Sequence, residues 1–118
     1  MANITTRRTI RKYTAENVPS DLLNELLKKA ERTQTMGNLQ LYSVVTTRDP
    51  ANKARLAPLH FNQPMVQDAP VVLTFCADFH RTTEWAKRRK GQPGYNNILS
   101  FLNAASDALL FCQTFCHL

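Results

Sequence analysis

The alternation of apolar and polar residues predicts both helices and strands along this chain. An amphipathic helix is predicted over residues 18–33, where apolar side chains recur at helical spacing, at Leu22, Leu23, Leu26, Leu27 and Ala30. Ser20 is the expected N-cap of this helix, because a serine hydroxyl can accept a hydrogen bond from the first turn. Shorter helices are predicted over residues 49–59, with Asp49 as the cap, and over residues 82–90.

Two segments rich in β-branched and aromatic residues predict strands. Residues 41–47 partly alternate between apolar and polar positions, as a strand does. Residues 69–78 form an almost continuous apolar run, which is typical of a strand buried on both faces. Gly37 and Asn38 indicate a loop before the first strand, and residues 91–97 indicate a second loop.

The last predicted helix, residues 97–118, is apolar on almost all sides. Its only polar surface is a narrow stripe formed by Ser100, Asn103, Asp107 and Thr114. Such a helix belongs in the interior of a protein, and each large side chain left in water forgoes about 1.5–3 kcal/mol of burial. The segment has no Gly, Pro or basic last turn. We therefore expect the chain to end within this element and the helix to be covered by another chain, with a twofold dimer as the default.

The bulk composition narrows the class of protein. The 118 residues, 43% of them hydrophobic, are enough for one folded domain over residues 1–118. No signal peptide or membrane span is expected, because polar residues interrupt the longest apolar stretch. Three cysteines without a framework spacing are typical of reduced thiols, so we expect a cytoplasmic protein. Cys112, Cys116 and His117 could suggest a metal site, but no second pair stands at zinc-finger spacing, and we expect the two cysteines to be small core residues.

The net charge of +6 is concentrated in two clusters, residues 7–12 and residues 87–90. On an extended segment Arg7, Thr9 and Arg11 would share one face, and two guanidinium groups with a hydroxyl suit a phosphorylated ligand. A solvated basic terminus is the alternative interpretation. A nucleic-acid surface is a third, but it usually interleaves aromatic residues over a wider basic face, and we expect no nucleic-acid partner.

The second cluster, Lys87 to Lys90, follows Trp85 at the end of a predicted helix. A solvated run of charge is the favoured interpretation. A surface that attracts an anionic cofactor such as NADPH is the second.

Several segments, taken in order, resemble the N-terminal half of the nitroreductase family of flavin enzymes. They are "RRTIRKYT", "VPSDLLNELLKKAERTQTMGNLQLYSVVTTRDP" and "HFNQPMVQDAPVVLTFCADFHR". The strand with "FCAD" is similar to that of oxygen-insensitive nitro- and flavin reductases, which often prefer NADPH. The resemblance implies an α+β nitroreductase-like fold in which two subunits interlock as a homodimer around two FMN molecules. Family chains are longer, so we expect Leu118 to fall inside the central helix, with the C-terminal half missing or supplied by another chain.

The resemblance also implies which residues hold FMN in the N-terminal segment. Arg7 would bind the phosphate, Arg8 and Thr9 would serve the ribityl and phosphate side, and Arg11 would lie near the N1/O2 edge of the ring. Thr9 stands where serine is commoner in the family, which keeps the hydroxyl.

Two further groups of FMN-binding residues are implied. Gln34, Thr35 and Met36 match the loop that reaches the flavin of the other subunit, although Met36 stands where serine is frequent. Gln63, with Asn62 as a competitor, matches the amide that bonds the pyrimidine end of the ring.

The implied activity is that of an FMN-dependent NAD(P)H oxidoreductase, which passes hydride from NAD(P)H through FMN to a small-molecule acceptor such as a nitroaromatic, a quinone or a free flavin. No catalytic side chain is expected, because the flavin carries the redox chemistry. Two alternatives stay open: a non-catalytic truncated fragment that dimerises through its last helix, and a basic nucleic-acid-binding module.

Overall fold

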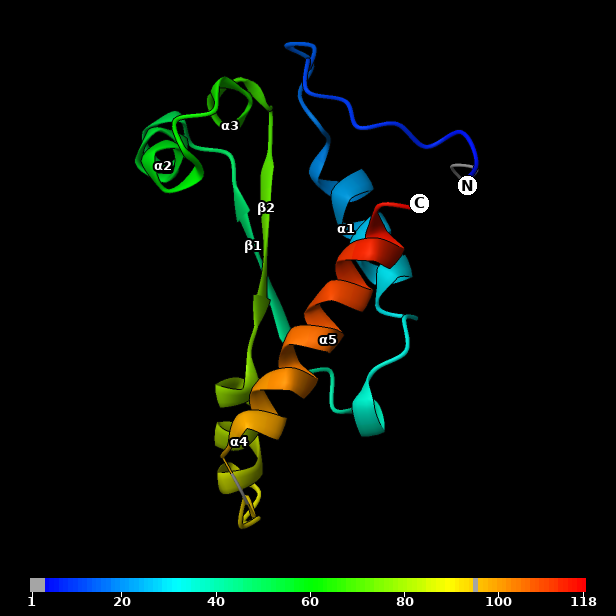
Figure 1. The fold of residues 1–118 in the computed structure, drawn as a ribbon, viewed down its shortest axis with the longest axis vertical. Coiled ribbons are helices and arrows are strands. Elements are labelled where there is room, and N and C mark those ends of the chain that lie inside the picture. Colours follow the sequence, from blue (N-terminus) through cyan, green and yellow to red (C-terminus); the bar gives the residue numbers. More distant parts are fainter. Residues whose placement is uncertain (1–3, 95) are drawn as a thin grey trace.

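The computed structural model describes residues 4–94 and 96–118, so Tyr95 of the predicted 91–97 loop lies outside the described residues. Helices and two strands alternate along the chain, which measures 47 × 33 × 27 Å (Figure 1). The elements are α1 (Ser20–Ala30), η1 (Met36–Asn38), β1 (Tyr42–Thr47), α2 (Pro50–Leu56), η2 (Ala57–His60), α3 (Pro64–Asp68), β2 (Val72–Ala77), α4 (Phe79–Arg88) and α5 (Ile98–Phe115).

The two strands form an antiparallel ribbon, which pairs Tyr42 with Ala77 at one end and Thr47 with Val72 at the other. Helix α5 packs across one face of this ribbon, and α1 packs on α5. The segment between the strands folds into α2, η2 and α3, which gather at one end of the ribbon, whereas α4 lies at the other end (Figure 1).

An aromatic cluster holds α5 on the ribbon. The ring of Phe111, 2% exposed, lies 4.3 Å from the ring of Tyr42 and 5.9 Å from that of Phe75, measured between centroids. Phe75 also contacts Phe115 one turn further along α5, at 5.9 Å. Tilted ring pairs at these separations add to the stabilisation from burial alone.

The predicted elements are found with shifted ends. Asp49 is confirmed as the cap of α2, since its carboxylate accepts a hydrogen bond from the amide of Asn52 at 2.9 Å. The N-cap prediction for Ser20 is wrong, because Pro19 occupies that position and its carbonyl accepts from the amide of Leu23. Ser20 is already inside the first turn.

Strand β2 differs from its prediction. Its residues are half-buried apart from the exposed Ala77, so the expectation of a strand buried on both faces is wrong for the described chain. The reason is that helices of this chain cover only one face of the two-stranded ribbon.

Helix α5 buries part of its polar stripe together with Phe111, and it leaves many of its other large apolar side chains exposed. Ser100 and Asp107 are each 1% exposed, whereas Ile98 and Leu109 are each 70% exposed. Asn97 caps the helix, and its side chain accepts from the amides of Leu99 and Ser100. The buried part of the stripe is therefore used within the chain, and the exposed apolar residues form the surface that the sequence predicts to need a cover.

The cysteine prediction holds only in part. Cys112 is half-buried, but Cys116 is exposed, so the expectation that both are core residues is wrong for Cys116. Burial, and secondarily the neighbouring Cys116 thiol, raises the pKa of the Cys112 thiol.

Among the described helices, α5 is long and apolar enough to cross a membrane. The core helix of a soluble protein meets the same criterion of length and composition. Helix α5 packs against β1, β2 and α1, and several of its large apolar side chains stay exposed.

Candidate functional site

The predicted phosphate-binding residues lie in an extended N-terminal segment. Arg7, Arg8, Thr9 and Arg11 are all exposed, and residues 7–14 have no regular secondary structure. None of the three guanidinium groups has an ion pair or hydrogen bond with another described residue. The segment therefore presents its donors to solvent in the single chain.

This segment is anchored where it enters α1. The guanidinium of Arg48, at the end of β1, donates to the carbonyl of Val18 at 2.7 Å. The second terminal nitrogen of Arg48, Nη2, is buried and has no partner among the described residues. This hydrogen bond attaches the C-terminal end of the segment to the ribbon at Val18. The basic residues precede this attachment point.

The predicted flavin loop follows α1 and has a constrained backbone. Gln34 is exposed and Met36 is 55% exposed, so both side chains are accessible. Beyond them, Gly37, Asn38 and Gln40 adopt left-handed φ values of 55°, 55° and 53°. For a residue other than glycine this conformation costs on the order of 1–3 kcal/mol, and it persists only where the surroundings enforce it.

The carboxylate of Asp107 on α5 supplies that enforcement. Its Oδ1 accepts from the amide of Met36 at 2.9 Å, and its Oδ2 accepts from the amide of Leu41 at 3.1 Å. Asp107 is 1% exposed and Leu41 is fully buried. One buried side chain thus holds both ends of the left-handed stretch against the last helix.

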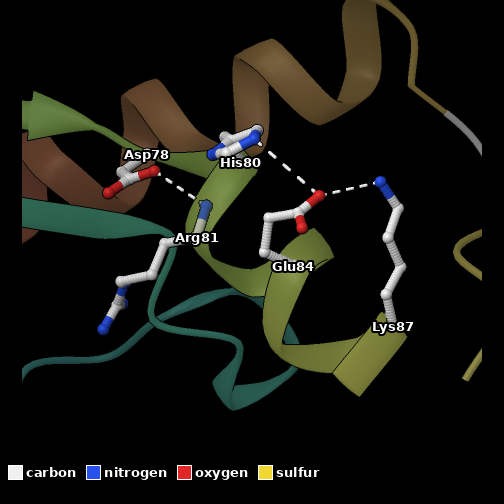
Figure 2. A network of polar contacts seen from close by, with 5 residues as sticks. All are labelled: Asp78, His80, Arg81, Glu84 and Lys87. Atoms are coloured by element: carbon white, nitrogen blue, oxygen red, sulfur yellow. Dashed lines mark hydrogen bonds and ion pairs between the residues drawn. The ribbon is translucent and has the colours of Figure 1, made fainter. Parts of the chain in front are cut away.

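A second set of contacts ties the same loop to α4. Asp78 caps α4 by accepting from the amide of Arg81 at 3.0 Å, and its other oxygen accepts from the hydroxyl of Ser43. Figure 2 shows the Arg81 side chain reaching away from the helix, and its guanidinium donates to the carbonyl of Gln40 at 2.5 Å. The amide of Asp78 donates to the carbonyl of Leu41 at 2.8 Å.

These bonds also set the charge state of Asp78. The Ser43 hydroxyl, followed by the Arg81 amide, lowers the pKa of the Asp78 carboxyl below its ordinary value of 3.8. The group is ionised at neutral pH and offers no proton for catalysis.

Thr35 contributes an unsatisfied polar atom to the loop. Its Oγ1 is buried and makes no hydrogen bond with any described residue. A buried hydroxyl without a partner is unfavourable, and such atoms commonly mark a place where a ligand or water binds.

Gln63 is the N-cap residue of α3. The preceding turn is also left-handed, with φ of 56° at Phe61 and 53° at its competitor Asn62. All three residues are exposed. The buried Lys53 supports this region, because its ammonium group donates to the carbonyls of Gln67 and Ala69 at 2.9 and 2.8 Å.

The single chain does not bring these predicted residues into one pocket. In Figure 1 the blue N-terminal segment lies toward the upper end of the long axis, whereas η1, which begins at Met36, lies toward the lower end. Helix α3, which follows Gln63, lies at the upper end. The basic segment and the loop that leads into η1 therefore lie apart within one chain.

Asp107 is the residue that the sequence reasoning missed. It was noticed only as part of the polar stripe. A lone carboxylate among apolar residues of a helix is the available signal, since a buried charge needs partners.

The comparisons with known proteins decide the family. A model of the nitroreductase family matches residues 4–111. The chain belongs to the nitroreductase family. A solved structure of a Bacteroides fragilis protein assigned as an oxidoreductase is 58% identical and superposes with a TM-score of 0.93 over 97% of this chain. A Bacillus subtilis FMN reductase (NADPH) is 31% identical over 93% of this chain, and a Thermus thermophilus NADH dehydrogenase is 46% identical over 61% of it.

This nitroreductase chain spans less than half the length of these relatives. It covers 46% of the Bacteroides fragilis chain, 45% of the Bacillus subtilis reductase and 35% of the Thermus thermophilus protein. Family and fold are thereby shown, and the α+β nitroreductase-like prediction is confirmed.

Replacing Asp107 with Asn is predicted to loosen the loop at residues 35–41. The amide group keeps one acceptor oxygen, so one of the two backbone amides loses its partner, at a cost of about 1–3 kcal/mol. Hydrogen exchange should show faster exchange at the Met36 or Leu41 amide. Asp49→Asn, which alters only the cap of α2, should leave both amides protected. Unchanged protection of both amides in Asp107→Asn would contradict the role assigned to this carboxylate.

The lowered pKa of Asp78 predicts an acid-dependent loss of stability. The folded chain binds fewer protons at this carboxyl than the unfolded chain does. Its contribution to the free energy of unfolding is therefore complete above pH 3.8 and is lost as the pH falls through the lower pKa of the folded state. Ser43→Ala removes the main cause of the shift and should flatten the stability profile in this acid range. Denaturant unfolding at a series of pH values measures this free energy, and Thr46→Ala, at an exposed position, is the control. If Ser43→Ala and the parent chain lose the same stability in acid, the assignment is refuted.

Proposed function

We propose that this chain works in an FMN-dependent NAD(P)H oxidoreductase whose flavin sites are shared between two copies. The observation that carries the proposal is the separation, along the long axis of one chain, of the basic segment at residues 7–11 from η1, which begins at Met36, the last residue of the predicted loop (Figure 1). In a twofold assembly the segment of one copy can meet the loop of the other.

The chemistry of the free donors fits FMN. The guanidinium groups of Arg7, Arg8 and Arg11 have no partner among the described residues, and forked cationic donors suit a phosphate. The unsatisfied Thr35 hydroxyl and the exposed Gln34 amide provide polar contacts of the kind that a flavin ring accepts. We assign Arg7, Arg8 and Thr9 to the phosphate and ribityl chain, Arg11 to the ring edge, and Gln63 to the pyrimidine end.

The exposed surface of α5 supports association with a second chain. Phe101, Leu102, Leu109 and Leu110 are 46–70% exposed, and all lie on the helix that carries Asp107. Burying this surface would favour a dimer and would bring a second copy close to the loop that Asp107 holds.

When bound, FMN supplies the redox chemistry by taking hydride from NAD(P)H and delivering reducing equivalents to a nitroaromatic, a quinone or a flavin. The chain's residues bind and orient. Arg11 places a fixed positive charge beside the ring edge where negative charge develops on reduction, and so favours the reduced state. The names of the relatives, an FMN reductase and an NADH dehydrogenase, agree with this activity.

The proposal includes a cytoplasmic location, supported by three free cysteines. The alternative of a non-catalytic chain that only dimerises is favoured by the same exposed α5 surface. It differs in requiring no flavin.

Substituting Arg7 and Arg11 separately tests the assigned roles. Each of Arg7→Gln and Arg11→Gln removes a charge-assisted hydrogen bond and should weaken FMN binding by about tenfold or more. Riboflavin, which lacks the phosphate, should lose affinity only in Arg11→Gln. The reduction potential of bound flavin should fall only in Arg11→Gln, because the charge beside the ring is lost.

Lys12→Gln is the matched control for these variants, since it removes a cation from the same segment outside the assigned contacts. Its FMN affinity should stay within about threefold of the parent value. Equal losses of FMN affinity in all three variants would indicate a non-specific effect of charge and would contradict the assigned roles. If the parent chain binds no FMN, the proposal fails and the non-catalytic alternative is favoured.

A further inference from the structure

The second basic cluster borders a groove that the flavin-binding residues do not use. The groove has a volume of about 790 Å³ and lies between α4 and the loop at residues 38–40. Arg81, Trp85 and Arg88 line it from the helix. Residues 79–90 carry five cations and one carboxylate, so this short segment holds most of the chain's net positive charge.

The carboxylates that line the groove are already engaged. Asp78 accepts from Ser43 and from the amide of Arg81. Figure 2 shows Glu84 between Lys87 and His80, with its Oε1 2.7 Å from the Lys87 ammonium and 3.8 Å from the His80 ring nitrogen. Both carboxylates stay ionised, and the neighbouring cations Arg81, Lys87 and Arg88 offset their negative charge.

One cation of the groove has no close partner within the described chain, and only the longer-range attraction of Glu84 acts on it. Arg81 donates to the carbonyl of Gln40, whereas Arg88 makes no hydrogen bond or ion pair with the rest of the described chain. An unpaired guanidinium on a groove wall is suited to a phosphate group, which it can bind through two parallel hydrogen bonds.

Trp85 gives the groove a flat aromatic surface. Its side chain is 59% exposed, and the guanidinium of Arg89 lies 5.4 Å from the ring centroid. An aromatic ring in this setting stacks well on a nucleobase, and a neighbouring arginine strengthens such a site. Phosphate and base contacts side by side indicate a nucleotide rather than an isolated anion.

The groove also adjoins the proposed flavin loop. Its wall at residues 38–40 follows directly after Met36, and the Arg81 hydrogen bond to Gln40 fixes the loop to α4. An elongated dinucleotide can lie with one end in the groove and the other near the flavin that Met36 approaches.

We propose that this groove binds the adenosine 2′-phosphate end of NADPH, with adenine on Trp85 and the 2′-phosphate on Arg88. The inference rests on the proposed function, because it assigns a site to that enzyme's reductant. It selects NADPH over NADH, since only NADPH carries the 2′-phosphate.

The chain provides its own probe for this site. Trp85 is its only tryptophan, so a ligand that stacks in the groove should change the intrinsic fluorescence. Titration with adenosine 2′,5′-bisphosphate, without FMN, should give a saturable change, and adenosine 5′-monophosphate should bind at least about tenfold more weakly. Arg88→Gln should abolish that preference, while Arg55→Gln, an exposed arginine on α2, should retain it.

Each outcome bears on the proposal. A saturable change with the 2′-phosphate preference, lost only in Arg88→Gln, supports it. No saturable change, equal affinity for both nucleotides, or a preference that survives in Arg88→Gln overturns it. Tighter binding of a single-stranded oligonucleotide than of the bisphosphate also overturns it in favour of a nucleic-acid surface. Because no flavin is present, failure here is distinguishable from failure of FMN binding.

Discussion

The buried carboxylate of Asp107 joins the last helix to the loop that precedes the first strand, and the geometry of the candidate site depends on this contact. It accepts from two backbone amides, those of Met36 and Leu41, and a charge with so little access to water is tolerated only when such partners are present. The left-handed residues between those amides are held in place as a result. Arg81 adds a bond from α4 to the Gln40 carbonyl, so three parts of the chain converge on one short loop.

The same helix favours association of this chain with another one. The polar residues Ser100 and Asp107 of α5 are buried within the chain, whereas several of its large apolar side chains are exposed. The proposed flavin contacts are also divided, because the basic segment and the loop that leads into η1 lie apart along the long axis (Figure 1). A second copy, or another chain with a matching surface, would resolve both features together by covering the apolar surface and completing the site. The physical need for burial and the chemical need for a shared site therefore favour the same assembly.

Local sequence signals predicted much of this fold. Helical spacing predicted α1 and α5, and the Asp49-Pro50 pair predicted the start of α2. Helix α3 was missed, because five residues are too few for a periodic pattern to emerge. The burial of β2 was overestimated. An apolar run shows that a strand is suited to burial, but it does not show which other elements of the described chain pack against it.

Only part of the candidate site was predicted from the sequence. The exposed arginines were identified through their residue types and the family resemblance. The role of Asp107 could not be predicted from its partners, because these are backbone amides 71 and 66 positions earlier, and backbone groups have no sequence signature. The groove beside Trp85 likewise depends on a contact between α4 and a distant loop.

The central claim is that two copies share the flavin, and sedimentation of the chain with FMN, followed by flavin absorbance, tests it most directly. The account predicts that the flavin colour travels with a species containing two chains. Flavin that sediments with a single chain, or that stays free while the protein sediments as a dimer, would contradict it.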